Sequence, residues 1–286
     1  MKILYAASEA TPFAKSGGLA DVAGSLPKAL VKDGVDARVI MPLYGDLKFR
    51  DTLEYVTNYS VPVGWRSQYC GLFKTERNGV TYYFLDNEYY FKRRGLYGFY
   101  DDGERFAFFS RAVLETLFYI DFTPDIINCN DWQTALVPIY LKDDSVREER
   151  FRSIRTVLSI HNIEYQGRYG RQTLGDLFGL DHGWADDGTI LMDGDVNLLK
   201  GAMLCADAVN ADQVDAVVRE LIDLATVDDD GLHARLLEQQ GTNLDQIKIL
   251  SDPGNRVERE FLVQGIHGKQ EFHNAGSLTA VPVHCA

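Results

Sequence analysis

Short apolar runs alternate with amphipathic segments through the first 208 residues, and this alternation limits the possible folds more than any other feature. Residues 2–7, 37–41 and 155–160 are predicted to form buried strands, and residues 20–32 place apolar side chains on one face of a helix. Buried strands that alternate with helices favour a Rossmann-like α/β fold, in which a parallel sheet is flanked by helices.

The same pattern predicts the remaining elements of this segment. Strands are expected at residues 54–63, 67–74 and 125–129, helices at 102–119 and 134–141, and a hairpin turn at Asn78-Gly79. Ligands of such sheets bind beyond the carboxyl ends of the strands. We therefore expect the functional residues in the loops at 8–18, 129–133 and 161–167.

The composition of the chain changes near residue 209. Of 33 aromatic residues, 31 lie within residues 1–208, so the last 78 residues have little with which to build a core. We expect one Rossmann-like domain over residues 1–208 and a small, mainly helical or irregular and partly disordered tail over residues 209–286. Within the tail, helices are predicted at 213–224 and 231–240.

Charge and cysteine usage narrow the class of protein. A formal net charge of −13 disfavours nucleic acid and anionic membranes as partners. The four cysteines lie far apart without a C-x-x-C pair, which indicates reduced thiols rather than disulfides or a zinc site. No signal peptide or membrane span is recognisable, so we expect a cytoplasmic protein. We also expect neither a metal nor a cofactor.

The first loop has the composition of an anion-binding turn. Gly17 and Gly18 stand between a strand and a helix, where unpaired N–H groups attract negative charge, and Lys15 adds a full positive charge. A diphosphate suits such a loop. The alternative is an ordinary turn, in which the glycines relieve steric strain and the lysine is solvated; the residues alone leave both interpretations open. Asp21, taken alone, complements the helix dipole.

Polar and aromatic side chains follow two further strands. Asp131 and Trp132 are placed to hold a ligand hydroxyl and to stack on a sugar ring, or alternatively to cap a helix and to fill the core. His161 and Asn162 end the strand at residues 155–160, where they are suited to bind hydroxyls or to polarise a leaving group. A purely structural histidine is the alternative for His161.

Four sequence runs occur in an order and spacing that resemble one enzyme family. They are KSGGLADV at 15–22, NDWQTALVP at 130–138, HNIEYQG at 161–167 and DGDVNLLKGAMLCADAV at 193–209. Over residues 1 to about 209 the chain resembles the bacterial glycogen synthases and plant starch synthases. Those enzymes are retaining glucosyltransferases with two facing Rossmann-like domains, the GT-B arrangement. They transfer glucose from ADP-glucose to the non-reducing end of an α-1,4-glucan such as glycogen, so the resemblance implies these two substrates.

The resemblance also implies roles for individual residues. Lys15, Gly17 and Gly18 match the loop that meets the phosphates of ADP-glucose. Asp21 matches an acidic residue at the sugar site, and His161 matches the histidine that contacts the transferred glucose. By this resemblance, His161 and Asp21 are the expected catalytic residues.

Further matched residues are expected to line the sugar and acceptor cleft. They are Asn162 beside the histidine, Asp131 and Trp132 in the wall, and Tyr165, Gln166 and Gly167 in a loop near the acceptor path. These positions complete the site that the resemblance implies within the first domain.

Beyond residue 209 the chain departs from the family pattern. The tail holds six Lys+Arg against thirteen Asp+Glu and offers no visible counterpart of the family's second domain, which brings an Arg and Lys pair for the diphosphate. We therefore expect little or no glucosyl transfer from these 286 residues alone, unless a partner chain supplies the second domain.

Two other classes of protein remain to be considered. The chain is alternatively a non-catalytic glucan-binding or regulatory module, or a truncated gene product. A nucleotide-dependent dehydrogenase is disfavoured, because no G-x-G-x-x-G run follows the first strand.

Overall fold

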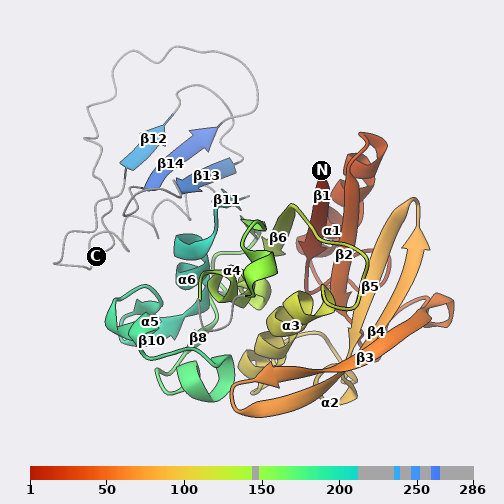
Figure 1. Ribbon diagram of the computed structural model, residues 1–286, viewed down its shortest axis with the longest axis horizontal. Helices are drawn as coiled ribbons and strands as arrows, with labels where there is room; N and C mark the ends of the chain where they lie inside the picture. Colours follow the sequence, from red (N-terminus) through yellow and green to blue (C-terminus); the bar gives the residue numbers. More distant parts are fainter. Residues whose placement is uncertain (144–147, 212–234, 239–245, 252–258, 265–286) are drawn as a thin grey trace.

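The computed structural model describes residues 1–143, 148–211, 235–238, 246–251 and 259–264, and an eight-stranded sheet forms its centre (Figure 1). The strands are β1 (Lys2–Ala6), β2 (Asp36–Pro42), β3 (Glu54–Val63), β4 (Arg66–Arg77), β5 (Val80–Asp86), β6 (Ile126–Asn130), β7 (Arg155–Ile160) and β11 (Ala208–Ala211). Their order is β11-β7-β6-β1-β2-β5-β4-β3, and the pairs from β11 to β5 are parallel. The expected Rossmann-like sheet is confirmed.

An antiparallel meander of β5, β4 and β3 closes one edge of this sheet. β4 and β5 are joined at Asn78-Gly79, whose φ angles are 54° and 77°. A two-residue hairpin turn needs both central residues in this left-handed region, which Asn and Gly adopt at low cost. The predicted hairpin is confirmed.

Within the described residues, four helices of seven or more residues accompany the sheet. They are α1 (Gly18–Lys32), α3 (Asp102–Thr116), α4 (Leu136–Lys142) and α6 (Leu198–Cys205); α2 (Glu88–Phe91) and α5 (Gly183–Asp186) are single turns. A 3₁₀ turn at Trp132–Thr134 precedes α4, so the helix predicted over 134–141 begins later than expected. Short turns also occupy Arg50–Thr52, Glu149–Phe151 and Leu174–Phe178, and β8 (Arg168–Tyr169), β9 (Leu191–Met192) and β10 (Asp195–Asn197) form a small antiparallel sheet.

Helix α3 is buried on nearly all of its surface. Phe106, Phe109 and Val113 of this helix and Leu117 at its end are all buried. Burial of a side chain of this size contributes about 1.5–3 kcal/mol to the free energy of folding. Helix α3 is therefore fixed in the core and limits the movement of the loop that precedes it.

The connections of the central strands create a crevice. The chain leaves β1 through α1 to reach β2 on one side, and it later returns to the other side of β1 as β6. Where successive connections depart in opposite directions, a crevice remains at the carboxyl ends of the strands. The loops after β1, β6 and β7 border this crevice.

The described part of the tail differs from the prediction. It forms a three-stranded sheet of β12 (Arg235–Glu238), β13 (Gln246–Ser251) and β14 (Arg259–Gln264). The helix predicted over 231–240 is therefore wrong where β12 lies, because backbone pairing with β14 overrides a weak helical pattern. The helix predicted over 213–224 lies outside the described residues.

Strand β11 carries the first sheet to Ala211, past the predicted domain end at residue 208. The division of the chain into a domain and a separate tail stays a prediction. Within the described ranges, no helix has the length and apolar character needed to cross a membrane.

Gly24 allows the loop after β1 to lie against α1. Thr11 N–H donates to Ala20 O at 2.9 Å, and a Cβ added at Gly24 comes within 2.0 Å of Thr11 Oγ1 and 2.6 Å of Thr11 O. We expect Gly24→Ala to lower the free energy of unfolding by about 1–3 kcal/mol, as overpacking does, in urea unfolding followed by circular dichroism. Ser25→Ala on the exposed side of the helix is the control, with a change below about 0.5 kcal/mol. Equal stability of the two variants would contradict this account of Gly24.

Candidate functional site

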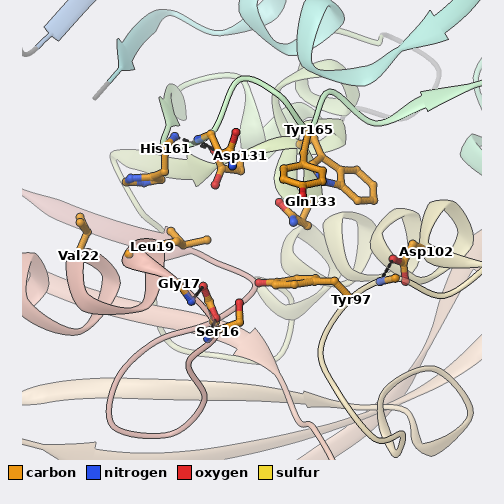
Figure 2. A pocket seen from close by; sticks show the side chains of 15 residues that line it. Ser16, Gly17, Leu19, Val22, Tyr97, Asp102, Asp131, Gln133, His161 and Tyr165 are labelled. Carbon is orange, nitrogen blue, oxygen red and sulfur yellow. Dashed lines mark hydrogen bonds between the residues drawn. The ribbon is translucent and has the colours of Figure 1, made fainter. Parts of the chain in front are cut away.

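A cavity of about 700 Å³ lies at the carboxyl edge of the sheet, between the loops that follow β1, β6 and β7 (Figure 2). Its described wall consists of Glu9, Ser16, Gly17, Gly18, Leu19, Val22, Tyr97, Gly98, Asp102, Asp131, Trp132, Gln133, His161, Asn162 and Tyr165. A volume of this size accommodates a nucleotide or a short sugar chain. Seven predicted site residues meet in this wall, namely Gly17, Gly18, Asp131, Trp132, His161, Asn162 and Tyr165.

The glycine loop already holds an internal anion. Gly17 is the N-cap residue of α1, and the N–H groups of Ser16 and Gly17 donate to the carboxylate of Glu9, at 3.2 Å from Gly17 N to Glu9 Oε1. Glu9 is only 2% exposed. Two of the amides expected to face a phosphate are therefore engaged by the protein itself. Glu9 was not predicted as a site residue, because its role depends on a contact with Ser16, seven residues later, that forms only when the loop folds.

Gly18 distinguishes between the two interpretations of this loop. A Cβ added there meets no heavy atom within 4 Å, and the residue does not have a positive φ. Steric strain therefore does not explain a glycine at this position. The space beside it belongs to the cavity, which favours the interpretation that the backbone approaches a ligand here.

Lys15 and Asp21 lie at the outside of the cavity. Lys15 Nζ is 2.6 Å from Asp21 Oδ2, and both side chains are more than half exposed. An exposed pair of this kind contributes little to stability. Neither residue is part of the described wall, so Lys15 lies at the rim and the predicted catalytic role of Asp21 stays a prediction.

Asp131 joins the ends of two strands. Its Oδ1 accepts hydrogen bonds from His161 N at 2.7 Å and Asn162 N at 3.2 Å, while its own N–H donates to Ser159 O at 2.9 Å. Its φ of 55° turns the side chain away from the helix, and it makes no side-chain cap. Asp131 is therefore neither the helix cap nor a freely offered ligand group, but the residue that positions the His161 loop.

His161 is oriented by a buried amide. Asn130 Nδ2 donates to Ala6 O at 3.0 Å and to Asn128 Oδ1 at 2.8 Å, which directs Asn130 Oδ1 toward His161 Nε2 at 3.0 Å. Because Oδ1 only accepts, Nε2 of His161 carries a proton. Asn128 and Asn130 were not predicted as site residues. Polar side chains in a buried strand usually have hydrogen-bond partners, and this pattern was the sequence feature that could have indicated them.

Trp132 separates the main cavity from a second one of about 440 Å³. The second cavity is lined by Trp132, Glu164, Tyr165, Gln166, Gly167, Arg168 and Tyr169. Trp132 is 8% exposed and packs edge-on against Phe106 at 5.2 Å between ring centroids. It is therefore largely a core residue with one edge at each cavity, whereas Tyr165 is 64% exposed and borders both.

Tyr97 forms the wall opposite Tyr165 and Gln133 (Figure 2). Its hydroxyl lies 2.7 Å from Ser8 Oγ, and burial together with the nearby charge of Glu9 raises its pKa. The loop that carries it is held by buried Arg105 and Asp102. Arg105 donates to Leu96 O at 3.2 Å and to Asp102, and Asp102 Oδ2 accepts from Gly98 N at 2.8 Å.

The Asp and Glu side chains of the described cavity wall have no Lys or Arg beside them in that wall. Three carboxylates line it, those of Glu9, Asp102 and Asp131, and its described residues include neither Lys nor Arg. Asp102 is paired with Arg105 behind the wall, whereas backbone N–H groups serve Glu9 and Asp131. Such an interior favours hydroxyl groups over anions. No group of three or more His, Cys, Asp or Glu in the described ranges is arranged to hold a metal ion.

Comparison with known proteins identifies the family. The model of the starch synthase catalytic domain matches residues 2–213. The chain belongs to this family. It is 51% identical over 211 residues to a glycogen synthase of Lactobacillus acidophilus, covering 73% of this chain and 44% of that protein. It is also 51% identical over 213 residues to a glycogen synthase of Clostridium acetobutylicum, covering 73% of this chain and 45% of that protein.

A solved structure agrees with this assignment. The catalytic domain of starch synthase IV from Arabidopsis thaliana, bound to ADP and acarbose, superposes with a TM-score of 0.66 at 32% identity. The match covers 72% of this chain and 44% of that one. The chain thus spans less than half of the length of these family members, and the resemblance expected from its four sequence runs is confirmed.

The variant Gly18→Ala tests whether the glycine loop binds a ligand, because it should change ligand affinity without lowering the stability of the protein. Because the added methyl group enters open space at the first position of a helix, we expect a melting temperature unchanged or slightly raised. The same methyl group narrows the cavity, and we expect binding of ADP to weaken about tenfold or more in titration calorimetry. A loss of stability without a loss of ADP binding would contradict the interpretation of Gly18 as a ligand-facing residue.

Proposed function

We propose that this chain forms one wall of the active site of a retaining glucosyltransferase that transfers glucose from ADP-glucose to an α-1,4-glucan. The observation that carries the proposal is the distribution of charge at the cavity. A cation and open helix amides lie at the rim, and hydroxyl-accepting carboxylates lie within. A sugar attached to a diphosphate is a ligand with the complementary distribution.

The diphosphate is assigned to the rim. The N–H groups at the start of α1, with the partial positive charge of the helix end, face one side of it at Gly18. Lys15 supplies the full charge after its ammonium group turns from Asp21 toward the phosphates. Asp21 is released by the same movement, which brings a carboxylate near the site that the family resemblance implies for it.

The transferred glucose is assigned to the interior, beside His161 and Asp131. The imidazole of His161 and the amide of Asn162 are polar groups suited to sugar hydroxyls. In the reaction, the bond from C1 to the β-phosphate oxygen breaks with its electron pair leaving on ADP. A glucan hydroxyl then bonds to C1 on the same face and passes its proton to the departing phosphate. The carboxylates of the wall stabilise the positive charge that develops on the sugar.

The acceptor glucan is assigned to the second cavity. Tyr165 and the edge of Trp132 border both cavities, so a chain lying along residues 164–169 has its end at the glucose position. Exposed aromatic faces such as that of Tyr165 stack on the apolar faces of sugar rings.

We also place this reaction in the cytoplasm. Cys70, Cys129 and Cys205 are buried and form no disulfide within the described residues, as is usual for proteins of a reducing compartment. Fractionation of cells that produce the tagged protein tests this assignment.

Lys15→Ala tests the diphosphate site. Loss of the Lys15 charge should weaken ADP binding to the chain by about tenfold or more in titration calorimetry at low salt. Lys32→Ala, at the other end of the same helix, is the matched control and should leave the affinity unchanged within about twofold. Tight ADP binding that survives Lys15→Ala would place the diphosphate elsewhere.

Glucosyl transfer is the second test. Expulsion of ADP concentrates negative charge on the leaving group, and each missing preorganised donor costs about 10²–10³ in rate. We expect the 286-residue polypeptide to incorporate no measurable labelled glucose into glycogen, with His161→Ala as the control. Incorporation that His161→Ala abolishes would contradict this expectation and would assign the second wall to the tail or to a partner copy of the chain.

A further inference from the structure

We propose that Glu9 determines which group may follow the diphosphate in the cavity, admitting a neutral sugar and rejecting a third phosphate. The inference rests on the diphosphate position proposed above and adds a residue that discriminates among nucleotides with the same base and the same first two phosphates.

Glu9 occupies the inner end of the glycine loop. Its two oxygens accept the N–H groups of Ser16 and Gly17, so the first two amides of the turn are taken. The open amides begin at Gly18, next to Lys15 at the rim. A phosphate therefore finds donors at the outer part of this loop and a carboxylate at its inner part.

No direct ion pair neutralises the negative charge of Glu9 within the part of the chain that the structure describes. The carboxylate is 2% exposed, and among the described residues it forms no ion pair with a Lys or Arg side chain. Lys15 is paired outward with Asp21, and buried Arg105 is paired with Asp102. Hydrogen bonds satisfy the oxygens of Glu9 but leave its charge in place, so its field extends into the cavity that it lines.

The direction of entry brings the group beyond the diphosphate toward this charge. Lys15 and Gly18 are exposed, whereas Glu9 and its neighbour Tyr97 lie deeper in the wall. With the diphosphate at the rim, the substituent on the β-phosphate points inward. A glucosyl group there can donate hydroxyl hydrogens to the carboxylate, while a γ-phosphate is repelled by it.

The first experiment compares ligands on the unaltered chain. Titration calorimetry at low salt with a metal chelator measures the affinities for ADP-glucose, ADP and ATP. We expect ATP to bind at least about tenfold more weakly than ADP-glucose, because two unscreened charges a few ångströms apart repel strongly. ATP affinity equal to that for ADP-glucose would overturn the assignment without the need for any variant.

The second experiment removes the charge while keeping the shape. Glu9→Gln should raise the affinity for ATP relative to ADP about tenfold, and its amide oxygen still accepts one of the two hydrogen bonds from the loop. Asp33→Asn is the matched control, because it removes an exposed negative charge at the far end of α1 and should leave the ATP to ADP ratio unchanged within about twofold.

The results of these two experiments distinguish a failure of the role of Glu9 from a failure of the proposed function. Absence of ADP binding in the unaltered chain would overturn both. ADP binding that depends on Lys15, with the same ATP to ADP ratio in Glu9→Gln and in the unaltered chain, would overturn the role of Glu9 alone. A ratio that changes in Glu9→Ala but not in Glu9→Gln would assign Glu9 to support of the loop and not to discrimination by charge.

Discussion

The hydrogen bonds of the Asp131 carboxylate join the end of β6 to the end of β7, and the geometry of the cavity depends on them. Two parallel strands deliver their loops to the same edge of a sheet but do not determine the distance between the side chains at the loop tips. By accepting the N–H groups of His161 and Asn162, Asp131 sets that distance. The amide of Asn130 then orients the imidazole ring from below. The positions of both candidate sugar-binding residues follow from these few contacts.

The second constraint is electrostatic. A chain with a net charge of −13 presents three carboxylates to its main cavity, while Arg105 is paired with Asp102 and Lys15 lies at the rim. Such a site binds an anionic ligand only through the loop amides and that lysine, whereas its interior suits hydroxyl groups. In the proposed function, the separation of the two regions along the cavity orients the nucleotide sugar with the diphosphate outward and the sugar inward.

The sequence predicted the strands, the hairpin at Asn78-Gly79 and the convergence of three loops, because apolar periodicity and strand polarity are local properties. It did not predict Glu9 or Asn130, whose partners lie seven or more residues away and become neighbours only in the folded chain. It also predicted a helix where β12 lies. That prediction is wrong because backbone pairing with β14 outweighs the weak helix propensity of these four residues.

The sequence by itself determined the family, the mainly parallel α/β order of residues 1–208 and seven of the fifteen described residues in the cavity wall. Tertiary structure alone decided how these residues are used: Asp131 holds a loop, Trp132 is largely core, and Lys15 is paired with Asp21 outside the wall. The physical reason is that residue type and spacing specify which groups are available for chemistry. Hydrogen-bond geometry, burial and the distance between charges exist only once segments far apart in the chain are packed together.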